Sequence, residues 1–169
     1  ELSSRTIEWQ CRIELANAYH IVAKFGQRDW GWTHSVYNHI TVKLPASCQE
    51  YYPDATGPLF LINAFGCRFD KVRPESLHTV DLKGNIMQHG VRISDVIPDY
   101  GVLLAGFTIH SAIHAARPDI NAIFHTHHPD VVAISALKCG LLPISNESCL
   151  ALSLLSKNRH PFEGTATDE

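Results

Sequence analysis

Apolar residues recur at two spacings along this chain, and each spacing predicts a different kind of element. Over residues 6–24 and again over residues 105–116 they recur every three or four positions, which predicts amphipathic helices packed on a sheet. Gly26 is expected to end the first helix. Arg117-Pro118 is expected to end the second, because a residue before proline disfavours the helical conformation.

Alternating or continuous apolar runs predict strands elsewhere. Residues 37–45 alternate between polar and apolar side chains, and residues 58–63 are almost wholly apolar, as in a central strand that is buried on both faces. Residues 79–87 predict a hairpin with Lys83-Gly84-Asn85 at its tip. Residues 121–127 predict a short strand.

Less regular segments complete the pattern. Residues 46–57 carry turn-forming residues and predict a loop. Asp130 is a good N-cap for a third helix, which Gly140 would end, and residues 141–145 predict a further strand. Helices and strands therefore alternate, with hairpins between them, which predicts an α/β sandwich whose helices cover a mixed central β-sheet. The length suits a single domain over residues 1–169.

Composition narrows the class of protein. The apolar and charged fractions, 45% and 18%, are those of an ordinary globular protein. A net charge of −3 and the lack of basic runs argue against nucleic acid as a main partner. No apolar run is long enough to span a membrane. The cysteines are odd in number and widely spaced, which favours reduced thiols in a cytoplasmic protein. They are Cys11, Cys48, Cys67, Cys139 and Cys149.

Two histidines one residue apart are the main candidates for chemistry. His125 and His127 lie in the strand predicted over residues 121–127, so their side chains point to the same face of the sheet. Two imidazoles on one face can act as a pair of metal ligands. Two hydrogen-bonded surface histidines have the same spacing, which by itself does not separate the two interpretations. His110 and His114 share one face of the second helix, where we expect a structural role.

Several segments match the motifs of one protein family. They are Tyr37-Asn-His-Ile-Thr41, Phe60-Leu-Ile-Asn-Ala-Phe-Gly66, Ala105-Gly-Phe-Thr-Ile-His-Ser-Ala-Ile-His-Ala-Ala-Arg-Pro-Asp119, His125-Thr-His127 and Ile134-Ser-Ala-Leu-Lys-Cys-Gly-Leu-Leu-Pro-Ile-Ser145. Together they resemble the class II aldolase and adducin head-domain family, nearest to its adducin-like branch. The resemblance runs from Trp9 to about Gly164 and implies the class II aldolase-like sandwich.

The resemblance implies a metal site built from histidines. In the aldolases of this family three histidines hold a divalent metal ion, usually zinc, which polarises the carbonyl group of the substrate. His125 and His127 match two of these ligands. The third belongs to an Asn-His-Gly segment that has no match here, so the domain is expected to lack its C-terminal segment. His160, the only histidine of the tail, matches a different position.

The resemblance also locates a catalytic base and a substrate-binding region. The family's aldolases use a glutamate as general base, and the matching position here is Gly106, which has no side chain to move a proton. Turns that hold the substrate's phosphate match Asn38, Asn63 and Gly66, which are therefore candidate substrate-binding residues. Other positions of these turns differ, which argues against a phosphorylated sugar as the ligand.

Two classes of function remain open. The first is a divalent-metal-dependent, aldehyde-lyase-like enzyme, with zinc as the expected ion, that acts on a small carbonyl or sugar-like substrate. The second is a non-catalytic adducin-like module that acts through oligomerisation and contacts with partners such as cytoskeletal proteins. His125 and His127 favour the first, whereas Gly106 and the missing third histidine favour the second. In both cases the resemblance implies a homo-oligomer, a tetramer by analogy with the family's aldolases.

Overall fold

A six-stranded sheet lies at the centre of the computed structural model, which describes residues 3–29, 37–88, 91–92 and 101–155. The strands lie in the order β5-β4-β3-β2-β1-β6, and all five pairings between them are antiparallel. The expected mixture of parallel and antiparallel strands is therefore wrong in the described sheet. Successive strands β1 to β5 are neighbours joined without crossovers, and such connections produce antiparallel pairs. The strands are β1 His39–Lys43, β2 Phe60–Asn63, β3 Leu77–Val80, β4 Ile86–Gln88, β5 Val91–Arg92 and β6 Ala122–His125.

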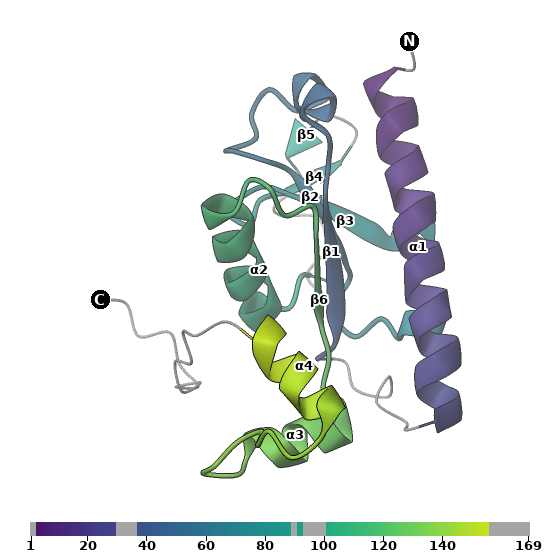
Figure 1. The fold of residues 1–169 in the computed structure, drawn as a ribbon. Coiled ribbons are helices and arrows are strands. Elements are labelled where there is room, and N and C mark those ends of the chain that lie inside the picture. The colour runs from purple at the N-terminus through teal and green to yellow at the C-terminus, as the bar shows by residue number, and fades with distance from the viewer. Residues whose placement is uncertain (1–2, 30–36, 89–90, 93–100, 156–169) are drawn as a thin grey trace. The chain divides into compact units, whose positions relative to one another are not determined.

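Helices cover both faces of this sheet. The long helix α1, Ser4–Asp29, lies along one face, and α2, Leu104–Ala116, lies on the other (Figure 1). Both were predicted, but α1 continues past Gly26, where the sequence predicted its end. Gly26 is buried, so close packing outweighs the cost of about 1 kcal/mol that glycine carries inside a helix.

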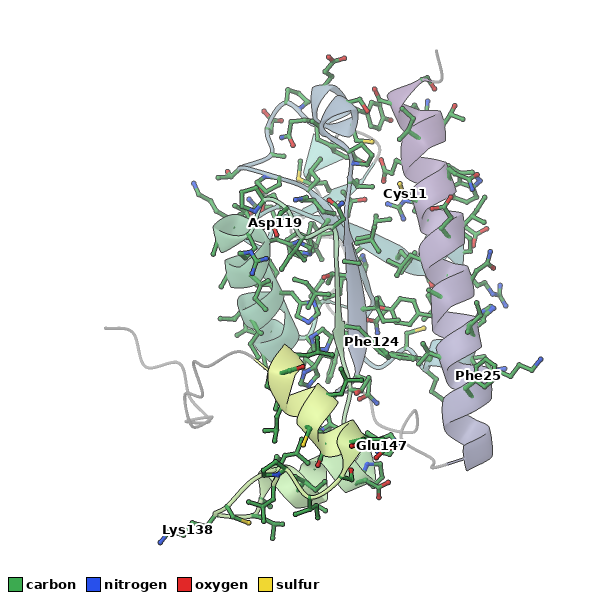
Figure 2. All side chains as sticks on the ribbon, viewed as in Figure 1. Cys11, Phe25, Asp119, Phe124, Lys138 and Glu147 are labelled. Carbon is green, nitrogen blue, oxygen red and sulfur yellow. The ribbon has the colours of Figure 1, made fainter. Side chains whose placement is uncertain are left out.

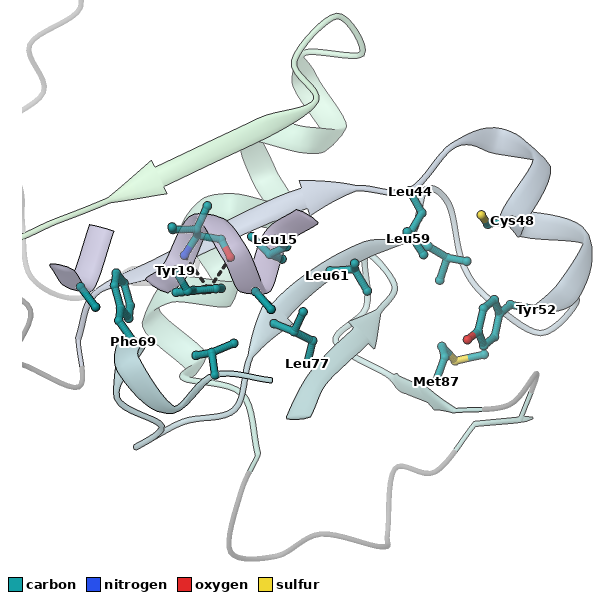
Figure 3. Packing of buried hydrophobic residues seen from close by; sticks show 14 residues of the cluster. Leu15, Tyr19, Leu44, Cys48, Tyr52, Leu59, Leu61, Phe69, Leu77 and Met87 are labelled. Atoms are coloured by element: carbon teal, nitrogen blue, oxygen red, sulfur yellow. Dashed lines mark hydrogen bonds between the residues drawn. The ribbon is translucent and has the colours of Figure 1, made fainter. Parts of the chain in front are cut away.

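Two apolar cores lie on opposite sides of β2. On the α1 side, Leu15 and Tyr19 pack with Leu59, Leu61 and other buried residues (Figure 3). On the α2 side, Phe60, Ile62 and Val80 form a smaller core against Phe107. All four residues of β2 are buried, which confirms the prediction of a central strand with two covered faces.

The hydroxyl group of Tyr19 joins α1 to two strands. It accepts a hydrogen bond from the backbone N–H of Ile40 at 2.8 Å, and it lies 2.6 Å from the carbonyl oxygen of Ile40 and 2.8 Å from Oδ1 of Asn63. Tyr19 is fully buried, and burial raises the pKa of its phenol, so the group stays protonated and able to donate. The helix is thereby fixed in one register against β1 and β2.

A buried ion pair makes a second connection between α1 and the sheet. Arg12 contacts the carboxylate of Glu8 at 2.8 Å and donates to the carbonyl oxygen of Leu77 and to Oγ1 of Thr79, both at 2.6 Å. Tyr52 donates to the other carboxylate oxygen of Glu8 at 2.8 Å. Every charged atom of the pair thus has a partner, as burial of charge requires.

Short helical turns connect the strands of the sheet. Residues 46–57, predicted as a loop, contain the 3₁₀ helix η1, Ala46–Tyr51, whose Cys48 enters the core on the α1 side. Two further 3₁₀ turns precede β3, η2 Phe69–Lys71 and η3 Pro74–Ser76. The hairpin of β3 and β4 forms as predicted, and Gly84 at its tip has a φ of +80°.

The chain divides into two compact units, Glu1–Pro129 and Asp130–Glu169, so the expectation of one domain stays a prediction. The second unit departs most from the sequence-based expectations. Helix α3, Pro129–Ser135, already contains Asp130 and ends well before Gly140. Among the described residues, 141–145 form no strand: Ser145 instead caps α4, Asn146–Leu154, by accepting the N–H of Ser148 at 3.1 Å. His160 and the rest of the tail lie outside the described residues. Within the described chain, no helix is long and apolar enough to cross a membrane.

The Tyr19 hydroxyl can be tested by removing it. We expect Tyr19→Phe to lower the free energy of unfolding by about 1–3 kcal/mol, because the buried Oδ1 of Asn63 and N–H of Ile40 lose their partner. Urea denaturation measures the change. Tyr51→Phe is the matched control, since no hydrogen bond of its hydroxyl is recorded in the described structure, and it should change stability by less than about 0.5 kcal/mol. Equal effects of the two substitutions would contradict this role for Tyr19.

Candidate metal site

The two histidines predicted as metal ligands lie at the end of the edge strand β6. His125 is the last residue of β6, so the strand predicted over residues 121–127 ends two residues early and His127 lies beyond it. Their Nε2 atoms are 2.9 Å apart, and their rings meet edge to face with centroids 4.8 Å apart. His125 is half-buried and His127 is exposed, so the pair can be reached from solvent. Phe124 directly precedes His125 in β6, so its side chain projects from the opposite face of the strand, and it is also exposed (Figure 2).

Asn38 fixes the backbone that carries His127. Its Oδ1 accepts the N–H of His127 at 2.8 Å, and the whole residue is only 1% exposed. Asn38 directly precedes β1, which pairs with β6. Asn38, predicted to bind substrate, therefore fixes the position of the backbone at His127.

A third histidine lies beside His125 on the neighbouring strand β1. His39 is the cross-strand partner of His125, and the two rings stack with centroids 4.9 Å apart. Nδ1 of His39 lies 3.0 Å from the carbonyl oxygen of Tyr37, so this nitrogen carries the proton and donates it. Nε2 is then the lone-pair nitrogen, and it has no hydrogen-bond partner among the described residues although it is buried.

Helix α2 adds two more imidazoles to this layer. Thr41 Oγ1 lies 2.8 Å from Nδ1 of His110 and 2.9 Å from Nε2 of His114. A hydroxyl has one proton, so Thr41 donates to at most one of the two rings and accepts from the other. The His110 ring also contacts that of His39, with centroids 4.3 Å apart. The structural role expected for His110 and His114 agrees with these buried contacts.

Burial keeps these imidazoles neutral. It lowers the pKa of His39 to about 4, opposed by the bond to the Tyr37 carbonyl, and it lowers the pKa of His110 to about 3. The pKa of His125 is lowered too, first by burial and then by repulsion from His127. Neutral imidazoles have a free lone pair, which is the form that binds metal ions.

Gly106 leaves room for the ring of His39. A Cβ atom at position 106 would lie 2.6 Å from Cε1 and 2.7 Å from Nε2 of His39, closer than real contacts allow. The imidazole therefore occupies the space into which a side chain at position 106 would extend. His39 was part of a matched motif, but nothing in the sequence marked it as a site residue. The only available signal was its strand position, which puts it on the same face as Thr41.

Two of the predicted substrate-binding residues lie on the other side of the sheet. Oδ1 of Asn63 contacts the hydroxyl of Tyr19, on the face that α1 covers. Gly66, with a φ of +80°, lines a pocket of about 860 Å³ together with Trp9 and Tyr52, also on the α1 side. The described structure therefore does not group Asn63 and Gly66 with the histidines, and their binding role stays a prediction.

The described structure brings two imidazole nitrogens together, those of His125 and His127. Within the described ranges, no group of three or more His, Cys, Asp or Glu side chains is placed so that it could hold a metal ion. His39 stacks against His125, with their planes 29° apart. What the arrangement offers directly is a pair of imidazoles that can share one cation, with a third neutral imidazole beside them.

Comparison with known proteins identifies the family of the chain. The model of the Class II Aldolase and Adducin N-terminal domain matches residues 14–164. The chain belongs to this family. Its fold is therefore the predicted α/β sandwich of the class II aldolases, with the antiparallel sheet described above.

Relatives of the chain include both aldolases and adducins. Alpha-adducin from Rattus norvegicus is 42% identical over 94% of this chain and 18% of its own length. A solved aldolase II superfamily protein from Pseudomonas syringae has a TM-score of 0.65 and 41% identity, and the match covers 87% of this chain and 50% of that one. L-fuculose 1-phosphate aldolase from Glaciozyma antarctica has a TM-score of 0.67 and 28% identity, with 90% and 54% covered. The chain thus spans about half the length, or less, of these relatives.

The close approach of Gly106 and His39 can be tested with a single methyl group. Alanine inside a helix is normally favoured over glycine by about 1 kcal/mol. We expect Gly106→Ala instead to lower the free energy of unfolding by about 1–3 kcal/mol, because the methyl group overlaps the His39 ring. Urea denaturation gives the value.

Gly101 provides the matched control, because a Cβ atom there would meet nothing within 4 Å. Gly101→Ala should be close to neutral. In the double variant Gly106→Ala with His39→Ala, the methyl group has space, so the combined loss should be smaller than the sum of the two single losses. Strictly additive losses would show that the two residues do not compete for the same volume.

Proposed function

We propose that this chain binds one divalent metal ion through His125 and His127 and acts as a metal-dependent, aldehyde-lyase-like enzyme on a small carbonyl or sugar-like substrate. The observation that carries the proposal is the 2.9 Å separation of the two Nε2 atoms. At this distance the two nitrogens are hydrogen-bonded to one another, and the same convergence lets both rings turn their lone pairs to one cation. Because the site is accessible and His125 favours its neutral form, ligation of a cation is supported.

The donor set matches the chemistry of zinc. Zinc prefers imidazole nitrogen among the protein ligands available here, and a catalytic site keeps a position open for substrate. When bound, such an ion would polarise a substrate carbonyl oxygen and stabilise the negative charge that develops next to it. The protein's own part is positional: β-pairing holds His125, and Asn38 holds the backbone of His127.

The surroundings support a substrate other than a phosphorylated sugar. Asn38 uses its Oδ1 on the N–H of His127, and Asn63 uses its Oδ1 on Tyr19. Neither of these oxygens is directed to a ligand. Gly106 supplies no proton-transfer group at the position where the family's aldolases have a glutamate. We therefore infer a small carbonyl compound whose recognition depends mainly on the metal ion.

Metal content tests the proposal. We expect wild-type protein dialysed against zinc and then against zinc-free buffer to keep about one ion per chain, measured by elemental analysis. His125→Ala with His127→Ala should lose the ion while the circular dichroism spectrum stays unchanged. The same variant should lose any cleavage of unphosphorylated hydroxycarbonyl compounds, followed by aldehyde release.

The control is His20→Ala, which removes a histidine on α1 whose Nε2 bonds the carbonyl oxygen of Val72, on the far face of the sheet. It should leave the ion in place. Wild-type protein that holds no ion, and whose thermal stability ignores a chelator, would contradict the metal site.

A second function, protein interaction, is favoured by the apolar surface of the second unit. Its exposed large apolar residues include Ile144 at 85% and Leu154 at 80% exposure. Val131, Ile134 and Leu137 of the same unit are also at least 36% exposed. Surfaces this apolar mark contacts with other proteins. Since alpha-adducin is among the relatives, we infer a homo-oligomer, with contact to cytoskeletal proteins as a further candidate.

Oligomerisation through this surface can be measured by sedimentation velocity. We expect the wild-type chain to sediment as an oligomer, and Ile144→Asp with Leu154→Asp to shift it towards the monomer, because a charge cannot be buried in an apolar contact without a partner. Lys138→Asp changes the charge of an exposed polar position in the same unit and should leave the mass unchanged. An oligomer that resists the double substitution would rule out this surface.

A further inference from the structure

The pocket on the α1 side of the sheet is a second candidate site, separate from the histidines of β6. It encloses about 860 Å³ and is lined by residues of α1, η1, β3 and β4 among others. Pockets of about 300–1,000 Å³ are those in which proteins hold small molecules. Neither His125 nor His127 is among its lining residues, so a ligand here would not depend on a metal ion there.

The walls of the pocket are largely aromatic and aliphatic. Trp9 and Tyr51 line it from α1 and η1, and Leu77 and Met87 line it from β3 and β4 (the last two are labelled in Figure 3). Trp9 is 44% exposed, so part of its indole is in contact with solvent. A flat apolar molecule placed against the indole would remove apolar surface from water, which is favourable by about 25 cal/mol per Å².

The polar part of the lining contains no free donor on Arg12. Its guanidinium donates to Glu8, to the carbonyl oxygens of Pro74 and Leu77, and to Oγ1 of Thr79. A second contact with Glu8, at 2.8 Å, occupies the remaining N–H. Because a guanidinium has five N–H groups, Arg12 has none left to offer a ligand.

Acceptors remain on Glu8 and Tyr52. Oε1 of Glu8 receives the bonds of Arg12 and Thr79, whereas the bond recorded for Oε2 is that of Tyr52, at 2.8 Å. A carboxylate oxygen has two lone pairs, so Oε2 can accept one more hydrogen bond. Burial raises the pKa of Tyr52, so its hydroxyl keeps the proton that it donates to Glu8. This part of the pocket therefore suits a ligand that brings a donor.

The acidic and arginine side chains around the pocket balance one another. Glu8 and Arg12 form an ion pair, and the other two, Arg5 and Glu75, are exposed and opposite in sign. A charged ligand would lose its hydration here without meeting an excess of the opposite charge. An uncharged ligand avoids this cost.

We propose that this pocket binds a small, flat, uncharged aromatic molecule with one hydrogen-bond donor, of the phenol class. The ring lies against Trp9, and the hydroxyl donates to Oε2 of Glu8. This site goes beyond the proposed function, because it is separate from the metal site and from the apolar surface of the second unit. Glu8 also joins α1 to Tyr52 and Thr79, so the ligand contacts a group that fixes the helix on the sheet.

Calorimetric titration of the full chain with three matched probes tests the ligand class. They are 4-ethylphenol, 4-ethylanisole, in which a methyl group replaces the donated proton, and 4-ethylbenzoate, which is charged. We expect 4-ethylphenol to bind at one site per chain at neutral pH. The anisole should bind at least about tenfold more weakly, because it cannot bond the carboxylate. The benzoate should bind more weakly than the phenol, because its charge is desolvated without a partner.

Variants at the wall test the location. Trp9→Ala should raise the dissociation constant of 4-ethylphenol at least about tenfold with an unchanged circular dichroism spectrum, and Trp9→Phe, which keeps a ring, should restore most of the affinity. Leu104→Ala is the control: it removes a side chain that is 74% exposed on α2, outside the pocket, and should change nothing.

Four results would overturn the proposal. They are a wild-type chain that does not bind 4-ethylphenol, equal affinity for the phenol and the anisole, tighter binding of the benzoate, and binding that Trp9→Ala leaves unchanged. None of them bears on the metal site, which is judged from the ion content of the protein.

Discussion

The side-chain alternation of β1 is the constraint on which the rest of the structure depends. Ile40 faces α1 and joins its core, and its backbone bonds the hydroxyl of Tyr19. His39 and Thr41, one residue away on either side, face α2 and its histidines. A shift of one residue would exchange these faces, burying imidazoles in the apolar core and apolar groups among the imidazoles. The register of one five-residue strand thus decides both the core and the candidate site.

Where α2 lies over β1 the layer between them is polar, beside the small apolar core that Phe60, Ile62 and Val80 form on the same face. Oγ1 of Thr41 bonds one ring nitrogen of His110 and one of His114 there, and burial holds both rings neutral. Buried polar networks of this kind favour one arrangement, because any other leaves groups unpaired. His39 lies at the end of this network, where its ring stacks on that of His125, and its Nε2 has no hydrogen-bond partner among the described residues. Through His39, which contacts both His110 and His125, the network helps to fix the position of the His125 ring.

Membership of the class II aldolase and adducin family leaves both kinds of function available to the chain. The converging Nε2 atoms of His125 and His127 support the metal-dependent one. The exposed apolar residues of the second unit, Ile144 and Leu154 among them, support the interaction module. The two features lie in different compact units, so one does not preclude the other.

The sequence by itself determined the helices α1 and α2, the central strand β2, the hairpin at Gly84 and the spacing that puts His125 beside His127, because these follow from local periodicity and turn chemistry. Three predictions were wrong where tertiary packing determines the outcome. Helix α1 continues past Gly26, residues 141–145 form no strand, and the described sheet is antiparallel instead of mixed. Only the tertiary structure showed that His39 fills the space beside Gly106 and lies opposite His125. These residues are far apart in the sequence, and their contact depends on strand register and on how closely α2 approaches the sheet, which no local pattern encodes.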